Sequence, residues 1–284
     1  MINFVKPRST EYYSQIWDSF IEPIARFVDT FSISDSSRND SLNVHLDNSH
    51  DYFEEVGVCG KNVYIPHGIA DKNLRDASML QLFDFVVVSG VYWKNKLIYE
   101  GMDLKKIFVG GYPKMDLVAK NIRVASTEIL WCPTHSNTPG STYPGLLPTI
   151  STLKDKYKVV VSEHPYNRES KLPTFSELST AKVVIADCGS TLYEAWALGI
   201  PVVFADWLVK DKIITVLAGS FEAKIYNEGI GYHANSEEEF VDMIEKAYNE
   251  YYLDYKVKEF IDGIFAPSLV GKSGKRIAEF LNGR

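Results

Sequence analysis

Cysteines are scarce in this chain and long apolar runs are missing, and each absence excludes a class of protein. The three cysteines, Cys59, Cys132 and Cys188, lie far apart, which excludes a disulfide framework and a CxxC metal site. No stretch reaches the roughly 18 uninterrupted apolar residues of a membrane span. The first ten residues lack the basic region and apolar segment of a secretory signal. We therefore expect a protein of the reducing cytoplasm.

Several familiar catalytic motifs are also missing. Gly271-Lys272-Ser273 resembles the end of a P-loop, but the earlier glycine position is Ala266 and no clear strand precedes it. No GxGxxG motif follows a strand, so we expect no dinucleotide cofactor. The segment 188–192 lacks the flanking glycines of a GxSxG nucleophile elbow. Without a short histidine pair such as HxxxH, we expect no metal either.

The charge balance argues against a general nucleic-acid binder. The formal net charge is −7 at pH 7, whereas such proteins usually present a basic surface. One dense basic stretch runs from Lys94 to Lys114. We interpret it as solvated lysines around a helix and its loops. The alternative is a contact with an anionic acceptor or a peripheral contact with a membrane surface.

Strand-length apolar runs recur along the chain, with helix-like segments between them. Most are rich in Val and Ile without clean alternation, which is typical of parallel strands covered on both faces. They lie at residues 42–46, 62–66, 83–89, 106–110, 128–132, 158–162, 182–186 and 201–205. This order predicts an α/β architecture with parallel sheets.

The chain of 284 residues is long enough for two lobes. The best boundary falls in the mixed stretch 118–126. We therefore expect a small N-terminal lobe at residues 1–120 and a C-terminal lobe at residues 121–284. The first 60 residues are harder to interpret. Residues 11–30 predict an amphipathic helix, 34–41 a polar loop, and only 42–46 suggest a strand.

The most informative stretch is residues 183–204, which predicts a buried strand, a turn, a short helix and a second buried strand. The turn Asp187-Cys188-Gly189-Ser190 places a carboxylate, a hydroxyl and backbone N–H groups at a helix N-terminus. Such an end can cradle phosphate, because the unpaired N–H groups and the helix dipole both favour an anion. Glu194 follows in the same helix. This unit predicts a nucleotide-diphosphate site.

Three histidines follow predicted strands, where open α/β sheets bind ligands. His67 follows the strand 62–66, and His164 follows 158–162. His135 follows 128–132, beside Thr134, whose hydroxyl could donate a hydrogen bond to a phosphate. Each histidine could act as a base or a phosphate partner, or merely satisfy a nearby loop carbonyl. For His233 we favour a structural role, and the sequence assigns none to the other two histidines.

Taken in order, short motifs along the chain resemble the CDP-glycerol glycerophosphotransferase family, which builds teichoic-acid-type polyol phosphates. The matching segments are 66–68 with Lys72, 83–90, 111–116, 129–134, 164–165, 187–201 and 271–277. The likeness covers roughly residues 60–284. It implies a GT-B fold, in which two Rossmann-like lobes have parallel sheets that face each other across a cleft. The nucleotide would lie mainly on the C-terminal lobe, and the acceptor would enter from the N-terminal side.

The resemblance also implies roles for individual residues. His67, preceding Gly68, would be the base that deprotonates an acceptor hydroxyl on a polyol phosphate or glycan. His164, Ser190 and Thr191 would hold the diphosphate of the nucleotide-activated donor, and Asp187 would orient this cluster. The remaining predicted substrate-binding residues are Gly68, Thr134, His135, Gly189 and Glu194. Family members often work at the membrane face, so we expect a cytoplasmic protein that could act at the inner face of the membrane.

Two departures from the family pattern keep other functions open. The family usually has an arginine two residues before the second histidine, where this chain has Ser162. Glu194 is closer to UDP-sugar glycosyltransferases and UDP-N-acetylglucosamine 2-epimerases, which often bind ribose hydroxyls with such a glutamate. It could instead lie on a helix surface. The alternatives are a UDP-sugar transferase acting on a glycan, a small molecule or a modified nucleic-acid base, an epimerase, and a non-enzymatic binding module.

Overall fold

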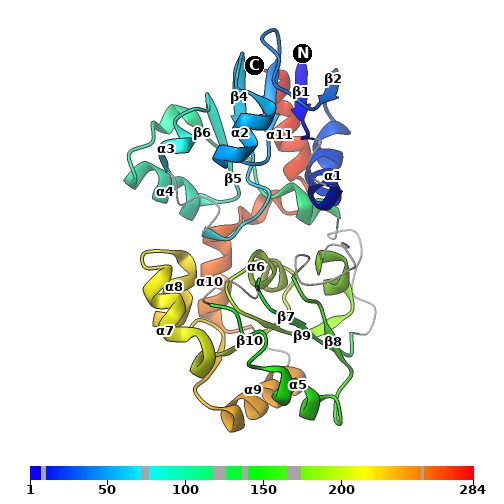
Figure 1. Cartoon of the computed structure of the whole chain (residues 1–284), viewed down its shortest axis with the longest axis vertical. Helices are drawn as coiled ribbons and strands as arrows, with labels where there is room; N and C mark the ends of the chain where they lie inside the picture. Colours follow the sequence, from blue (N-terminus) through cyan, green and yellow to red (C-terminus); the bar gives the residue numbers. More distant parts are fainter. Residues whose placement is uncertain (8–10, 72–76, 118–125, 136–139, 165–173, 251–252) are drawn as a thin grey trace. The chain divides into compact units, whose positions relative to one another are not determined.

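A computed structural model describes residues 1–7, 11–71, 77–117, 126–135, 140–164, 174–250 and 253–284 (Figure 1). The chain divides into two compact units. Unit 1 comprises Met1–Gly68, Asn73–Asn121 and Asp262–Arg284, and unit 2 comprises Ile69–Lys72 and Ile122–Ile261. Among the described helices, none is both long and apolar enough to cross a membrane.

Unit 1 is built on a six-stranded sheet in the order β2-β1-β3-β4-β5-β6, and every strand pair is parallel. The strands are β1 (Ile2–Val5), β2 (Phe31–Ser34), β3 (Leu42–His45), β4 (Lys61–Tyr64), β5 (Phe85–Val88) and β6 (Ile107–Val109). All residues of β1 and β3 are buried, as expected where helices cover both faces of a parallel sheet. The edge strand β2 is exposed at alternate residues.

The helices of unit 1 come from both ends of the sequence. They are α1 (Glu11–Ala25), α2 (His50–Val56), α3 (Ala77–Leu80), α4 (Val91–Tyr99) and α11 (Ser273–Asn282), with short 3₁₀ turns η2 (Leu104–Lys106), η3 (Pro113–Leu117) and η5 (Pro267–Leu269). Helix α11 packs against α1 and η3. The last segment of the chain therefore belongs to the same unit as the first.

Asp116 fixes the start of α11. Its carboxylate accepts the N–H groups of Ser273 (3.1 Å) and Gly274 (2.7 Å). The Ser273 hydroxyl accepts the N–H of Tyr112 (3.0 Å). Gly111 has a φ of 86°, and a Cβ there would lie 2.4 Å from the Ser273 hydroxyl. The segments 111–116 and 271–277, which matched the family separately, thus form one structural junction.

A second junction holds the segment that leads to α11. The Ser89 hydroxyl donates to the Ile264 carbonyl (2.7 Å), and the Ala266 N–H donates to the Ser89 carbonyl (2.9 Å). A Cβ at Gly90 would lie 2.4 Å from the Ile264 oxygen, so the close approach requires glycine. The motif at 83–90 therefore serves the architecture of unit 1.

Unit 2 has a five-stranded parallel sheet in the order β11-β10-β9-β7-β8. Its strands are β7 (Glu128–Cys132), β8 (Val159–Val161), β9 (Ala181–Ala186), β10 (Val202–Ala205) and β11 (Tyr232–Ala234). Its helices are α5 (Leu147–Leu153), α6 (Ser190–Ala197), α7 (Asp206–Val216), α8 (Phe221–Glu228), α9 (Glu237–Glu250) and most of α10 (Tyr255–Ile264), with the 3₁₀ turn η4 (Thr174–Ser179).

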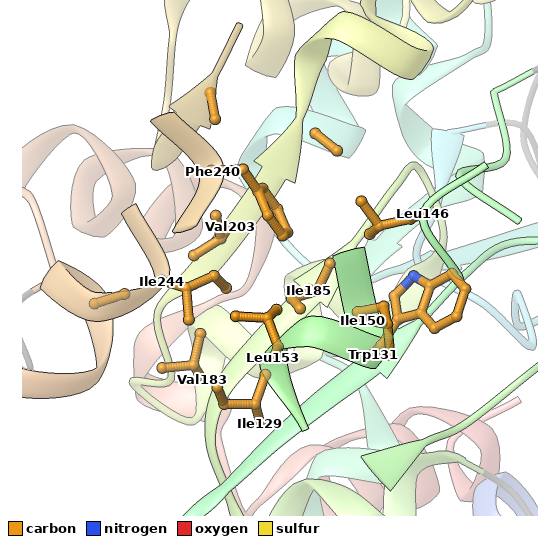
Figure 2. Packing of buried hydrophobic residues seen from close by; sticks show 13 residues of the cluster. Ile129, Trp131, Leu146, Ile150, Leu153, Val183, Ile185, Val203, Phe240 and Ile244 are labelled. Carbon is orange, nitrogen blue, oxygen red and sulfur yellow. The ribbon is translucent and has the colours of Figure 1, made fainter. Parts of the chain in front are cut away.

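Alternate residues of β7, β9 and β10 form one face of the core of unit 2 (Figure 2). Trp131 and Ile185 of this face pack among residues of α5 and α9, including Ile150 and Phe240. Each of these side chains is at most 1% exposed. Burying such a side chain contributes about 1.5–3 kcal/mol, so the central strands are held firmly. The strand ends that carry the candidate site rest on this core.

The expected α/β fold with parallel sheets is confirmed. The contiguous lobes 1–120 and 121–284 differ from the observed units in two places: Ile69–Lys72 belongs to unit 2, and Asp262–Arg284 belongs to unit 1. Three strands were missing from the prediction: β1, β2 and β11. They have only three or four residues each, and each includes a polar residue: Asn3, Ser32 and His233, respectively.

We expect Gly274→Ala to destabilise the protein, because the added Cβ would lie 2.3 Å from the carbonyl oxygen of Pro23 in α1. Overpacking of this kind costs about 1–3 kcal/mol. Gly283→Ala, at the other end of α11, is the matched control, since its nearest heavy atom would be 3.6 Å away. Urea unfolding measures both variants. Equal stability of the two would contradict the close packing of α1 and α11.

Candidate functional site

The predicted strand–turn–helix unit is present in unit 2. Strand β9 ends at Ala186, and α6 begins at Ser190. Gly189 is the N-cap residue, with an extended backbone. A Cβ at this glycine would meet nothing within 4 Å. Open space therefore lies beside the N-terminus of α6, whose first N–H groups and dipole favour an anion.

Asp187 lies in this turn and is only 1% exposed. One carboxylate oxygen accepts the N–H groups of Thr134 (2.8 Å) and Thr142 (3.1 Å). Its own carbonyl accepts the hydroxyl of Tyr226 (3.1 Å). Asp187 thereby ties the loop after β7 to the turn before α6. Its expected role in orienting His164, Ser190 and Thr191 stays a prediction.

Thr134 and His135 lie on that loop. Thr134 is 4% exposed, and within the described part of the chain its hydroxyl has no hydrogen-bond partner. The ring of His135 packs edge-on against the ring of His164, with centroids 5.5 Å apart. Both histidines are half-buried. The structure thus brings together Asp187 and three predicted residues from the ends of β7 and β8.

The hydroxyl of Ser190 has a partner that the sequence did not predict. It accepts the backbone N–H groups of Ile69 (3.1 Å) and Ala70 (3.4 Å). Ser190 therefore anchors the segment that begins at Ile69 and Ala70 within unit 2. The hydroxyl of Ser190 can still donate its own hydrogen to a ligand. Thr191 follows it at a half-buried position in the first turn of α6.

Glu194 is 1% exposed in the interior of α6. It does not lie on an open helix surface, which was one of the two expectations. A buried carboxylate must be hydrogen-bonded or paired, because its desolvation is otherwise costly. Its predicted role in binding ribose hydroxyls stays a prediction.

His67 and Gly68 belong to unit 1. His67 Nδ1 lies 2.6 Å from the carbonyl oxygen of Leu46. Since a carbonyl only accepts, Nδ1 carries the ring proton, and in the neutral ring Nε2 is the basic nitrogen. This tautomer is the one a general base needs. Gly68 is buried and is the last residue before the chain passes into unit 2.

The segment after Gly68 holds a buried carboxylate pair that sequence reasoning missed. Asp71 and Glu222 are both 0% exposed. Glu222 Oε1 accepts the Asp71 N–H (2.9 Å) and the Tyr193 hydroxyl (2.7 Å), and Asp71 accepts the N–H of Phe221 (2.8 Å). Burial raises the pKa of Glu222, and the nearby charge of Asp71 raises it further.

Two other histidines are structural in their surroundings. His45 is fully buried between the Tyr52 hydroxyl (2.8 Å) and the Asn62 amide oxygen (2.9 Å). Burial lowers the pKa of His45 to about 4, although the bond to Asn62 opposes the change. His233 bridges Asp206 and a backbone carbonyl, in keeping with the structural role expected for it.

One group of three potential metal ligands, all exposed, occurs among the residues that the structure describes. It consists of His50, Asp51 and Glu54 on α2. Exposed acidic residues at one end of a short helix are common without a metal, and none of the predicted site residues belongs to the group.

Comparison with known proteins shows the fold. No protein-family model matches the chain, and no curated protein is detectably similar in sequence.

The solved structure of the wall teichoic acid polymerase TagF is similar over 100% of this chain and 88% of its own, with 14% identity and a TM-score of 0.66. The UDP-GlcNAc 2-epimerase of Methanocaldococcus jannaschii, in complex with UDP-GlcNAc and UDP, is similar over 100% and 99%, with 14% identity and a TM-score of 0.55. A putative UDP-N-acetylglucosamine 2-epimerase of Listeria monocytogenes gives 12% identity, 97% and 94% coverage and a TM-score of 0.57. The chain therefore has a GT-B-like fold, as the resemblance implied.

We expect the stability of unit 1 to fall as the pH drops, through His45. Its pKa is about 4 in the folded state, against 6.5 for an unperturbed histidine, so the unfolded chain binds the extra proton first. The contribution is fully present above pH 6.5 and is lost towards pH 4, amounting to about 3 kcal/mol. Urea unfolding between pH 4 and 7.5 measures this.

The matched comparison for that experiment is the slope of stability against pH in His45→Gln, which should be shallower than in the wild type. His50→Gln, at an exposed position, should keep the wild-type slope. An unchanged slope in His45→Gln would show that His45 is not the group that titrates.

We expect Glu222→Gln to stabilise the protein above neutral pH. The raised pKa of Glu222 means that its stabilising contribution is present at low pH and is lost as the pH rises through the folded-state pKa. Glutamine keeps the acceptor for Tyr193 and the Asp71 N–H, and removes the charge beside Asp71. The gain should be about 1 kcal/mol or more at pH 8, measured by urea unfolding. Lower stability at pH 8 would mean that the carboxylate is compensated in the folded state.

Proposed function

We propose that this chain is a transferase that moves a glycerophosphate group from CDP-glycerol to a hydroxyl of an acceptor. The observation that carries the proposal lies in unit 2, where the open N-terminus of α6 follows the turn that Asp187 ties to the loop bearing His135. The GT-B-like fold supports it, and so does the structure of a histidine-to-asparagine variant of TagF with CDPG.

The donor diphosphate is proposed to lie at the N-terminus of α6. Gly189 lacks a side chain there, so a phosphate can approach the backbone N–H groups closely. Ser190 and Thr191 supply hydroxyl donors, and the buried hydroxyl of Thr134 supplies a third. The imidazoles of His135 and His164 add polar and cationic partners. These groups would stabilise the charge that develops on the leaving nucleotide.

His67 is proposed as the general base. Its Nε2 takes the proton from the acceptor hydroxyl, and the oxygen lone pair forms a bond to the β-phosphorus of CDP-glycerol. The bond from that phosphorus to the bridging oxygen breaks, and its electron pair leaves with CMP. The hydrogen bond from Nδ1 to Leu46 fixes the ring in the required tautomer. Neither a covalent intermediate nor a cofactor takes part in this step.

A UDP-sugar enzyme, either a transferase or an epimerase, is the second candidate. Glu194 favours it, because its buried carboxylate lies on the helix whose N-terminus would hold the diphosphate. The fold is also shared with epimerases whose structures contain UDP or UDP-GlcNAc. In this case Glu194 would accept the ribose hydroxyls of uridine. Loss of uridine binding in Glu194→Ala would distinguish it from the first candidate.

The acceptor and the place of action follow from the same proposal. We propose that unit 1 receives a polyol-phosphate or glycan acceptor, and that unit 2 receives the nucleotide. The three cysteines are all free thiols, which agrees with a reducing compartment. We therefore place the reaction in the cytoplasm, with an acceptor at the inner face of the membrane.

Ligand-induced thermal stabilisation separates these candidates first. A ligand at 100 times its Kd adds about 2.7 kcal/mol to the stability of the native state. CMP, CDP, CDP-glycerol, UDP, UDP-glucose, UDP-N-acetylglucosamine and GDP form the panel. Stabilisation by cytidine compounds alone supports glycerophosphate transfer, and stabilisation by uridine compounds supports the second candidate. If no nucleotide stabilises the protein, the result favours the third alternative, a binding module without transferase activity.

We expect His67→Asn to lower CDP-glycerol turnover about 10²–10⁴-fold with little change in the affinity for the donor. Asparagine can still donate to the Leu46 carbonyl, so the loop should keep its place. Steady-state release of CMP and equilibrium binding of CDP-glycerol measure the two effects. His50→Gln is the control, and it should leave both unchanged. Turnover that survives in His67→Asn rules out His67 as the base.

A further inference from the structure

Ser162 stands at the position where the resemblance leads one to expect an arginine. The residue is 1% exposed. Its hydroxyl donates to the carboxylate of Glu177, and its N–H donates to the Trp131 carbonyl (2.8 Å). Position 162 is therefore part of the packing between β8 and η4. Position 162 therefore offers no fixed positive charge to a diphosphate.

Two imidazoles lie at the same strand ends. β7 and β8 are neighbours in the sheet, with Trp131 opposite Val161. His135 comes four residues after Trp131 and His164 three after Val161, and their rings meet edge-to-face with centroids 5.5 Å apart. The residue before His135 carries the buried Thr134 hydroxyl that has no partner among the described residues. The N–H of Thr134 is held by Asp187, two residues before the N-cap of α6.

We infer that His135 and His164 form a clamp for the donor diphosphate that takes up a proton when the anion binds. The inference rests on the proposed nucleotide site of unit 2. A diphosphate diester brings two negative charges, and opposite charges this close favour the protonated form of each ring. The clamp thus supplies the positive charge that the missing arginine would have provided. It does so only when the imidazoles are protonated.

Among the residues that the structure describes, the neighbouring elements carry further titratable groups. They are Glu163 beside His164 on the loop after β8, Glu177 on η4, and Asp187 and Cys188 in the turn before α6. Glu177 is engaged by Ser162, and Asp187 is engaged by the N–H groups of Thr134 and Thr142. Because other titratable groups lie on the neighbouring elements, substitution of the histidines is needed to show that the imidazoles are the groups that take up the proton.

The test is calorimetric titration of the full chain between pH 6 and 8.5, in buffers that differ in ionisation enthalpy. The probes are CDP-glycerol and UDP-N-acetylglucosamine, whose diphosphate diesters keep a constant charge over this range, together with inorganic pyrophosphate. The wild type should bind a probe about tenfold more weakly at pH 8 than at pH 6, with net proton uptake. His135→Gln should lose the pH dependence and weaken binding about tenfold at pH 6.

Further variants make the test specific. His135→Arg should bind with a flatter pH profile, because its charge is fixed. His50→Gln should behave as the wild type. Circular dichroism at each pH shows whether every variant is folded.

The outcomes separate the clamp from the proposed function. Nucleotide binding without proton uptake, or with the same pH dependence in His135→Gln, overturns the clamp and leaves the transferase proposal standing. Pyrophosphate itself titrates in this range, so its binding supports the clamp only where proton uptake is smaller in His135→Gln than in the wild type. That result without binding of either nucleotide overturns the proposed donor. Failure of all three probes to bind the folded wild type overturns both.

Discussion

The carboxylate of Asp187 is almost fully removed from water, and two backbone N–H groups from the loop after β7 donate to one of its oxygens. A buried carboxylate without such donors would cost several kcal/mol. The position of that loop is therefore coupled to the turn that begins α6. His135 lies on the loop, and Ser190 follows the turn. The placement of Thr134 and His135 beside the turn before α6 depends on this one acceptor, and the packed strands beneath it keep the acceptor in place.

Burial sorts the histidines into different chemical roles. His45 is enclosed, and burial lowers its pKa to about 4, so the ring is neutral and serves the core of unit 1. His67 is half-buried against a carbonyl that selects its tautomer. His135 and His164 have each other as aromatic neighbours. His45, His67, His135 and His164 all lie at or after the carboxyl ends of parallel strands. Position in the sheet therefore cannot separate structural from functional histidines, whereas burial and partners can.

Much of the fold follows from local sequence, because short Val- and Ile-rich runs between turn residues, such as those of β5 and β9, are typical of buried parallel strands. The strand–turn–helix unit around Gly189 was predictable for the same reason. The pairing of Asp71 with Glu222 was not, since the two residues are 151 positions apart and only the folded chain brings them together. Segments 111–116 and 271–277 each resemble the family, but their contact through Asp116 and Ser273 joins residues 157 positions apart, which local sequence does not predict.

The two units are interleaved in the sequence, and this imposes an order on their completion during synthesis. Most of unit 1 leaves the ribosome first, yet helix α11, which is capped by Asp116, is translated after all of unit 2. Unit 2 can therefore close its sheet while the surface of α1 that receives α11 still faces solvent. Unit 1 therefore begins first and is completed last, and until α11 has been synthesised the part of α1 that it covers stays exposed.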